Sequence, residues 1–143
     1  MRYLLLLLVV SHLGLAQVTL EKRVESPVEV GGKIKVSYEI VNEFDTELVV
    51  TLTDENVIGT EGFVIECLQF KLPPQSGGEL DLERNKLETN FTAPHSGTFE
   101  LGNATLTFKN PDLGIVESVS DSAMVKITGR GSVTGNVTRI NTC

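Results

Sequence analysis

Polar and apolar residues alternate with a period of two through Lys33-Ile34-Lys35-Val36-Ser37-Tyr38-Glu39-Ile40. Such a period places one set of side chains on a buried face and the other in solvent, as in a half-buried β-strand. The predicted inward residues are Ile34, Val36, Tyr38 and Ile40. Gly31-Gly32, directly before the run, predicts a turn.

Further strand patterns lie on both sides of this stretch. Val18 to Val24 predicts a strand that stops at Ser26-Pro27, and Leu48, Val50 and Leu52 alternate in a strand expected to end at Asp54-Glu55-Asn56. The remaining strands are expected in Phe63–Leu72, Glu79–Leu82, Leu87–Thr92, Thr98–Phe108 and Ile115–Ile127. About seven or eight short strands separated by turn signals predict an all-β, immunoglobulin-like antiparallel β-sandwich, with an open barrel as the alternative.

Two local features refine this prediction. Leu101 and the face formed by Ala104, Leu106 and Phe108 are out of phase by one residue, so Gly102-Asn103 is expected to form a β-bulge. The segment 110–114, Asn-Pro-Asp-Leu-Gly, has the composition of a hairpin turn.

The chain has 143 residues and a formal net charge of −7, which suits one domain. This acidity argues against nucleic-acid partners, which need a lysine and arginine surplus, and against docking on anionic lipid. A basic start, the apolar run from Leu4 to Val10 and the small residues of Gly14-Leu15-Ala16 predict a secretory signal peptide over residues 1–16. The sandwich is then expected over residues 17–127, and no later segment has the roughly 20 apolar residues of a membrane helix.

Residues 128–143 are rich in Gly, Thr and Asn and are expected to form a polar, flexible tail. Cys143 ends this tail, and the other cysteine, Cys67, lies in a strand pattern. An oxidising compartment favours cysteine pairing. Three states remain open at this point, namely an intrachain disulfide, an intermolecular disulfide and free thiols.

Three N-glycosylation motifs are the strongest chemical signal in the chain. They are Asn90-Phe91-Thr92, Asn103-Ala104-Thr105 and Asn136-Val137-Thr138. Phe91 is expected to face inward, which turns Asn90 outward, and Asn103 is opposite in phase to the face of Ala104. With a signal peptide present, all three asparagines are candidate glycan acceptors, and ordinary polar strand residues are the alternative.

Catalytic and metal chemistry find little support. His95, the one histidine beyond the leader, lies in a predicted turn beside Pro94, and no activating neighbour is visible for Cys67. Ligand spacing for zinc is missing, and the acidic pairs at Glu43 with Asp45 and at Asp54-Glu55-Asn56 are weak calcium candidates without EF-hand spacing. A non-enzymatic protein that needs no cofactor is therefore expected. Protein binding could use a sheet edge or exposed apolar residues, for which Val57, Ile58 and Phe63 are candidates, although Phe63 also fits a core position.

The strand pattern also resembles a known family. Val28-x-Val30-Gly31-x-Lys33-Ile34-x-Val36-x-Tyr38-x-Ile40-x-Asn42 is similar to the opening strands of the translocon-associated protein beta subunit, also called signal sequence receptor beta. Leu48, Val50, Leu52 and Asp54 fit the next strand, and the later stretch from Asn90 through Gly97-x-Phe99 to Asn103-Ala104-Thr105-Leu106-Thr107-Phe108 has a similar layout. The resemblance covers about Val28 to Ile127. Secreted prokaryotic sandwich repeats of surface-layer and adhesion-like proteins share the opening pattern.

This resemblance implies a β-sandwich in the lumen of the endoplasmic reticulum. Such a domain assembles with sister subunits beside the protein-conducting channel and assists the translocation of nascent chains. Family members continue into a transmembrane helix, whereas this sequence ends at Cys143. Three explanations of the missing helix remain open. The chain is a truncated or spliced form, it is a divergent soluble relative, or the match is purely architectural. The alternative function is a secreted or cell-surface interaction module.

Overall fold

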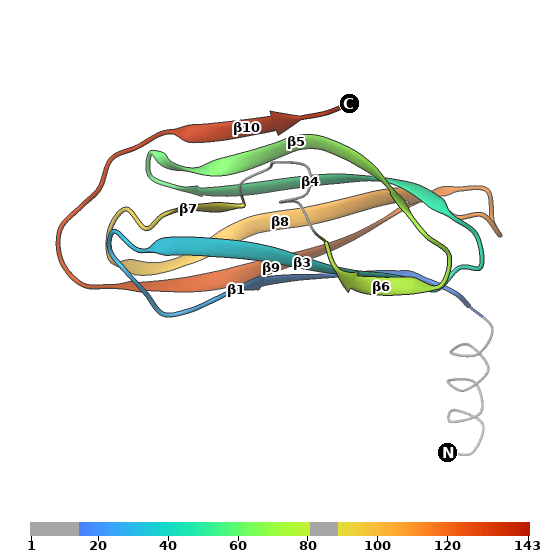
Figure 1. Ribbon diagram of the computed structural model, residues 1–143, viewed down its shortest axis with the longest axis horizontal. Helices are drawn as coiled ribbons and strands as arrows, with labels where there is room; N and C mark the ends of the chain where they lie inside the picture. Colours follow the sequence, from blue (N-terminus) through green and yellow to red (C-terminus); the bar gives the residue numbers. More distant parts are fainter. Residues whose placement is uncertain (1–14, 81–88) are drawn as a thin grey trace, which may run out of the picture.

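The computed structural model describes residues 15–80 and 89–143, which form strands, turns and loops with no helix among them. Ten strands make two sheets that pack face to face (Figure 1). The chain is therefore all-β, and the predicted β-sandwich is confirmed at the level of the fold. The strands are β1 (Val18–Val24), β2 (Val28–Glu29), β3 (Lys33–Asn42), β4 (Leu48–Ile58), β5 (Glu61–Leu72), β6 (Ser76–Glu79), β7 (Asn90–Thr92), β8 (Gly97–Lys109), β9 (Val116–Thr128) and β10 (Val137–Asn141).

The two sheets differ in size and in strand direction. One sheet has the order β1-β3-β6 with β7 also paired to β3, and the other has the order β10-β5-β4-β8-β9-β2. Most pairs are antiparallel, but β10 pairs with β5 and β2 pairs with β9 in parallel. The sequence predicted a purely antiparallel sandwich of fewer strands. The two additional strands are β2 and β10, which are too short to give a clear alternating pattern and which form the two parallel pairs. The strand expected at Glu79–Leu82 begins where β6 ends, and its last two residues lie outside the described part of the chain.

The alternation from Lys33 to Ile40 places one set of side chains in the core, as predicted. Ile34, Val36, Tyr38 and Ile40 of β3 are all almost fully buried between the sheets. They pack in one core with apolar residues of β4, β5 and β8, among which Val50, Leu52, Phe63 and Leu106 have almost no exposed surface. Removal of this surface from water is the main stabilising term of the fold.

The predicted irregularity in β8 is present. The β8–β9 register shifts between Leu101 and Ala104, which makes Gly102-Asn103 a bulge, and both Leu101 and Ala104 remain buried. The backbone passes close to β4 here, because a Cβ atom on Gly102 would lie 2.7 Å from the carbonyl oxygen of Glu55. Glycine is therefore required at this position.

The strand that begins at Leu48 is longer than predicted. Instead of ending at Asp54-Glu55-Asn56, β4 continues to Ile58, and the side chains of Asp54 and Asn56 point into the core. Polar residues usually indicate a turn, but here they continue the inward phase of Val50 and Leu52. The prediction of a strand end at this triplet is wrong.

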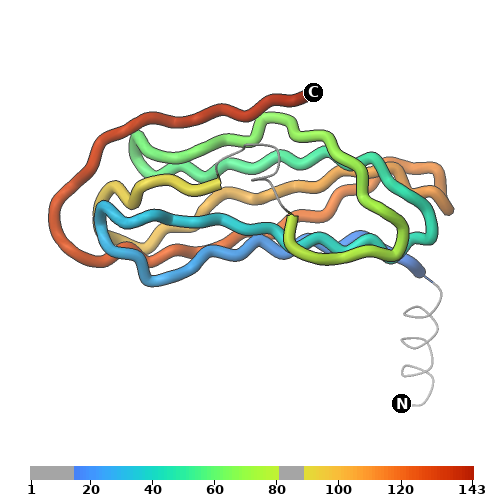
Figure 2. The backbone as a smooth tube through the Cα atoms, in the orientation of Figure 1, coloured from blue at the N-terminus to red at the C-terminus, as the bar shows by residue number. Residues whose placement is uncertain are grey.

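The last residues of the chain complete the six-stranded sheet. After β9 the backbone passes around one end of the sandwich and returns along the opposite edge as β10 (Figure 2). Ile140 is buried against the core, and the backbone N–H of Val133 donates to the carbonyl oxygen of Pro94 at 2.7 Å. The flexible tail predicted for residues 128–143 is wrong, and the sandwich domain extends beyond Ile127 to the end of the chain.

Candidate functional site

The two cysteines are joined in an intrachain disulfide. Cys67 lies in β5 and Cys143 follows β10, with their Cα atoms 5.7 Å apart. Next to the bond, the backbone N–H of Thr142 donates to the carbonyl oxygen of Cys67 at 2.8 Å. Of the three states left open by the sequence, the structure has the intrachain one. Because its sulfur is bonded, Cys67 offers no thiolate for catalysis.

The asparagines of the three glycosylation motifs lie on different elements of the fold. Asn90 starts β7 and is half-exposed, while Asn103 in the bulge and Asn136 before β10 are exposed. Phe91 is buried, so the inward and outward assignments for β7 and β8 are correct. The predicted leader over residues 1–16 lies almost entirely outside the described residues.

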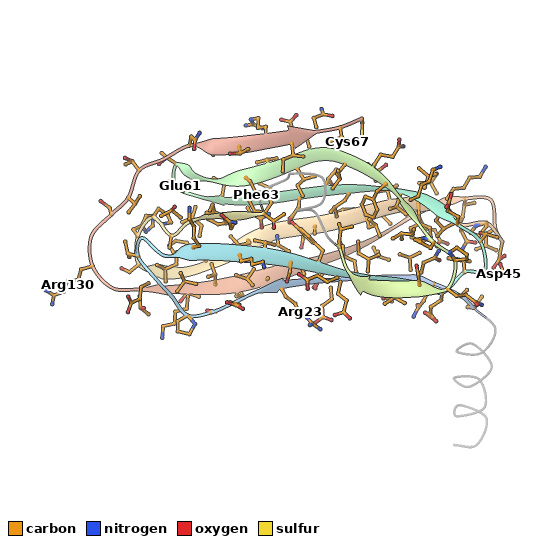
Figure 3. All side chains as sticks on the ribbon, viewed as in Figure 1. Arg23, Asp45, Glu61, Phe63, Cys67 and Arg130 are labelled. Atoms are coloured by element: carbon orange, nitrogen blue, oxygen red, sulfur yellow. A yellow bond between two sulfur atoms is a disulfide. The ribbon has the colours of Figure 1, made fainter. Side chains whose placement is uncertain are left out.

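The other candidate residues for catalysis, metal binding and protein contact do not come together in one site. His95 is exposed, and its ring stands edge-on to Phe99 with 5.2 Å between the ring centroids. Glu43 and Asp45 are exposed on the β3–β4 loop. Asp45 is labelled in Figure 3. Ile58 and Phe63 are buried and Val57 is half-buried, so these three residues do not form the exposed apolar surface considered from the sequence. Among residues 15–80 and 89–143, no group of three or more His, Cys, Asp or Glu side chains gathers as a metal site.

A cluster of polar side chains lies inside the sandwich, and Tyr38 is the member of it that the sequence predicted to face inward. Lys22 of β1 donates from Nζ to Asp54 Oδ1 of β4 at 2.8 Å, and both side chains are fully buried. The Tyr38 hydroxyl of β3 donates to Asp54 Oδ2, and Asn56 Nδ2 donates to the same oxygen at 2.9 Å. A calcium role for Asp54 is wrong, because both of its carboxylate oxygens are engaged within the protein.

The electrostatics of this cluster follow from its burial. Loss of hydration lowers the pKa of Lys22, and the negative charge of Asp54 opposes that shift. Burial raises the pKa of Tyr38, which the carboxylate of Asp54 reinforces, so the phenol stays protonated. The cluster is not fully satisfied, since Asn56 Oδ1 is buried without a hydrogen-bond partner within the described part of the chain. An alternation count could have found these residues, because Lys22 shares the inward phase of Val18.

The turn between β8 and β9 presents exposed apolar residues. Leu113, Ile115 and Val116, here called the hairpin patch, have exposed fractions of 62%, 52% and 71%. Hydrogen bonds of Asn110 hold the turn in place. Its Oδ1 atom accepts from the backbone N–H groups of Asp112 and Leu113 at 2.9 and 3.1 Å, and its own backbone N–H donates to the carbonyl oxygen of Ile115 at 2.8 Å.

The braced turn keeps the hairpin patch in solvent. Neither the turn nor Val116 belongs to a glycosylation motif, and the patch lies at the end of the sandwich that also holds Asp45 (Figures 1 and 3). Exposed apolar side chains close together in sequence on a hydrogen-bonded turn are typical of a protein contact. This patch is the candidate binding site.

A surface groove along β1, lined by residues of both sheets, is a weaker candidate. Glu21, Arg23, Lys35 and Glu79 are among its lining residues. The guanidinium of Arg23 is already engaged by Glu21 at 3.0 Å and by Glu39 at 2.8 Å. These exposed charges compensate one another, which is typical of a solvated sheet face.

Comparisons with known proteins add no family. No protein-family model matches the chain, and no curated protein matches it either. Within the described residues, the structure has no helix with the length and apolar character needed to cross a membrane.

Proposed function

We propose that this chain is a non-enzymatic β-sandwich of the secretory pathway that binds other proteins through the hairpin patch. The observation that carries the proposal is the exposure of Leu113, Ile115 and Val116 on a turn that Asn110 braces. A free apolar surface of this kind loses unfavourable hydration when a partner covers it.

The secretory pathway is supported by two independent features. The apolar leader pattern of residues 1–16 is typical of a secretory signal, and a Cys67–Cys143 disulfide is stable in an oxidising compartment. The exposed positions of Asn103 and Asn136 and the half-exposed position of Asn90 fit glycan acceptors.

The resemblance to the translocon-associated beta subunit supplies a specific form of this proposal. On that basis the domain resides in the lumen of the endoplasmic reticulum, contacts sister subunits or the protein-conducting channel, and assists translocation. The alternative is a secreted or cell-surface interaction module, and the same hairpin patch would serve it. The identity and location of the bound partner separate the two.

The test is co-purification of tagged protein from mildly solubilised membranes. The hairpin variant Leu113→Ser/Ile115→Ser/Val116→Ser is expected to recover about tenfold less channel or translocon-associated protein than wild type, since the change removes apolar contact area. Met124→Ser is the matched control, because Met124 is a similarly exposed apolar residue in the middle of β9. Equal recovery with all three proteins would contradict the assignment of the patch.

A further inference from the structure

An amine and a carboxyl group meet inside the sandwich without access to solvent. Lys22 Nζ lies 2.8 Å from Asp54 Oδ1, and both side chains have no exposed surface. Lys22 belongs to β1 of the smaller sheet and Asp54 to β4 of the larger one, so the pair bridges the two layers. Removing two charges from water is expensive, and well-packed apolar residues often stabilise a core as well or better. Stability alone gives a poor reason for this pair.

Burial of Lys22 disfavours its charged form. Burial lowers the pKa of Lys22, and transfer of one proton to the facing carboxylate removes both charges from the interior. Nζ also donates to the carbonyl oxygen of Gly102 at 2.8 Å. The bulge in β8 thus holds one N–H bond of the amine, and the lone pair that proton transfer to Oδ1 would leave on Nζ faces Asp54.

The surroundings of Asp54 favour attack on its carboxyl carbon. Oδ2 accepts hydrogen bonds from the Tyr38 hydroxyl and from Asn56 Nδ2, the latter at 2.9 Å. Fixed donors at a carboxyl oxygen stabilise the negative charge that grows there when a nucleophile adds to the carbon. The other oxygen, Oδ1, lies beside Nζ and is placed to receive its protons.

We propose that Lys22 and Asp54 condense to an intramolecular isopeptide bond that joins β1 to β4. The Nζ lone pair forms a bond to Cγ, and charge develops on Oδ2 between Tyr38 and Asn56. The bond from Cγ to Oδ1 then breaks, and Oδ1 leaves as water with two protons that both come from the lysine ammonium. An ammonium and a carboxylate become one neutral amide and one water molecule, so no oxidant or co-reactant is needed.

The product suits its place in the fold. A neutral amide removes both buried charges, keeps an N–H donor toward Gly102 and keeps a carbonyl oxygen for Tyr38 and Asn56. The bond would tie the first strand, β1, to the larger sheet, as the disulfide at Cys67 already ties the last strand, β10. Terminal strands are where unfolding and proteolysis usually begin. The bond would lie in the interior and would not depend on a partner at the hairpin patch.

Peptide mapping of the purified wild-type protein after disulfide reduction tests the bond directly. Trypsin cannot cleave after a modified Lys22, so the peptide that ends at Arg23 should remain joined to the peptide from Val36 to Lys71. The linked pair should be lighter than the sum of the two peptides by the mass of one water molecule. Fragmentation should place the link between Lys22 and Asp54.

The variant Lys22→Arg keeps the positive charge but lacks a primary amine, and it should yield the two peptides separately. Lys33→Arg, which changes an exposed lysine of β3, should retain the link. The peptide map of the wild-type protein tests the isopeptide bond even if Lys22→Arg does not fold. Recovery of separate wild-type peptides, with trypsin cleavage after Lys22, would overturn the proposal and leave an ion pair only.

Discussion

Replacement of Cys143 by serine should destabilise the domain by several kcal/mol, because the disulfide closes a long loop. The bonded cysteines are 76 residues apart in sequence. Loss of loop-closure entropy for a loop of this length amounts to about 4.5 kcal/mol at 25 °C, and removal of a native disulfide typically costs about 2–5 kcal/mol. At about 4 °C per kcal/mol for a domain of this size, the melting temperature should fall by roughly 8–18 °C.

Chemical denaturation and calorimetry of Cys143→Ser measure this loss. The double variant Cys67→Ser/Cys143→Ser is the control, and it should match the single variant closely, since each lacks the same bond. Hydrogen exchange should then find the amides of Val137–Asn141 exposed while those of β4 stay protected, because β10 pairs with β5 alone. A loss below about 1 kcal/mol would refute the view that the disulfide holds β10 in place.

Three further outcomes are expected. Burial raises the pKa of Tyr38, so above about pH 10.5 the folded phenol keeps a proton that the unfolded phenol releases. The unfolding free energy of wild type should therefore fall by about 1.4 kcal/mol per pH unit relative to Tyr38→Phe. Equal slopes of the two proteins in pH-dependent denaturation would contradict this. Gly102→Ala should cost about 1–3 kcal/mol in urea unfolding, since its Cβ would meet the carbonyl oxygen of Glu55, whereas Asn103→Ala in the same bulge should change little in unglycosylated protein. Protein from a glycosylating host should lose mass on glycosidase treatment, and an unchanged mass would remove the three motifs from the account.

Local alternation was sufficient to predict much of the fold. The inward residues of β3, the bulge at Gly102-Asn103 and the turn that begins at Asn110 all follow from residues adjacent in sequence. In each case the side-chain period or the turn chemistry is contained within a few positions. No information about distant strands was needed.

The buried cluster was missed because its members are far apart in sequence. Asp54 is a typical turn residue when considered alone, and only its contact with Lys22, 32 positions earlier, explains its place inside a strand. The phase of each strand does carry a signal, since Asp54 and Asn56 continue the inward series of Val50 and Leu52. The polar composition of Asp54-Glu55-Asn56 indicates a turn, although the phase of these residues continues the strand.

The last strand was missed for a different reason. Residues 137–141 include a single strongly buried apolar side chain, Ile140, and their pairing partner β5 lies some 75 residues away in sequence. A short polar segment of this kind has little β-strand signal of its own. The disulfide at Cys143 and the neighbouring sheet edge determine its structure, and neither can be deduced from the segment itself.

The proteins recovered together with the domain are the direct test of whether it binds partners within the secretory pathway. Wild-type protein tagged after Cys143 should be purified both from solubilised membranes and from the medium, and its partners should be identified by mass spectrometry. We expect recovery from membranes together with channel and translocon-associated subunits. Recovery from the medium with surface partners would instead favour the secreted interaction module, and recovery without any protein partner would contradict the account.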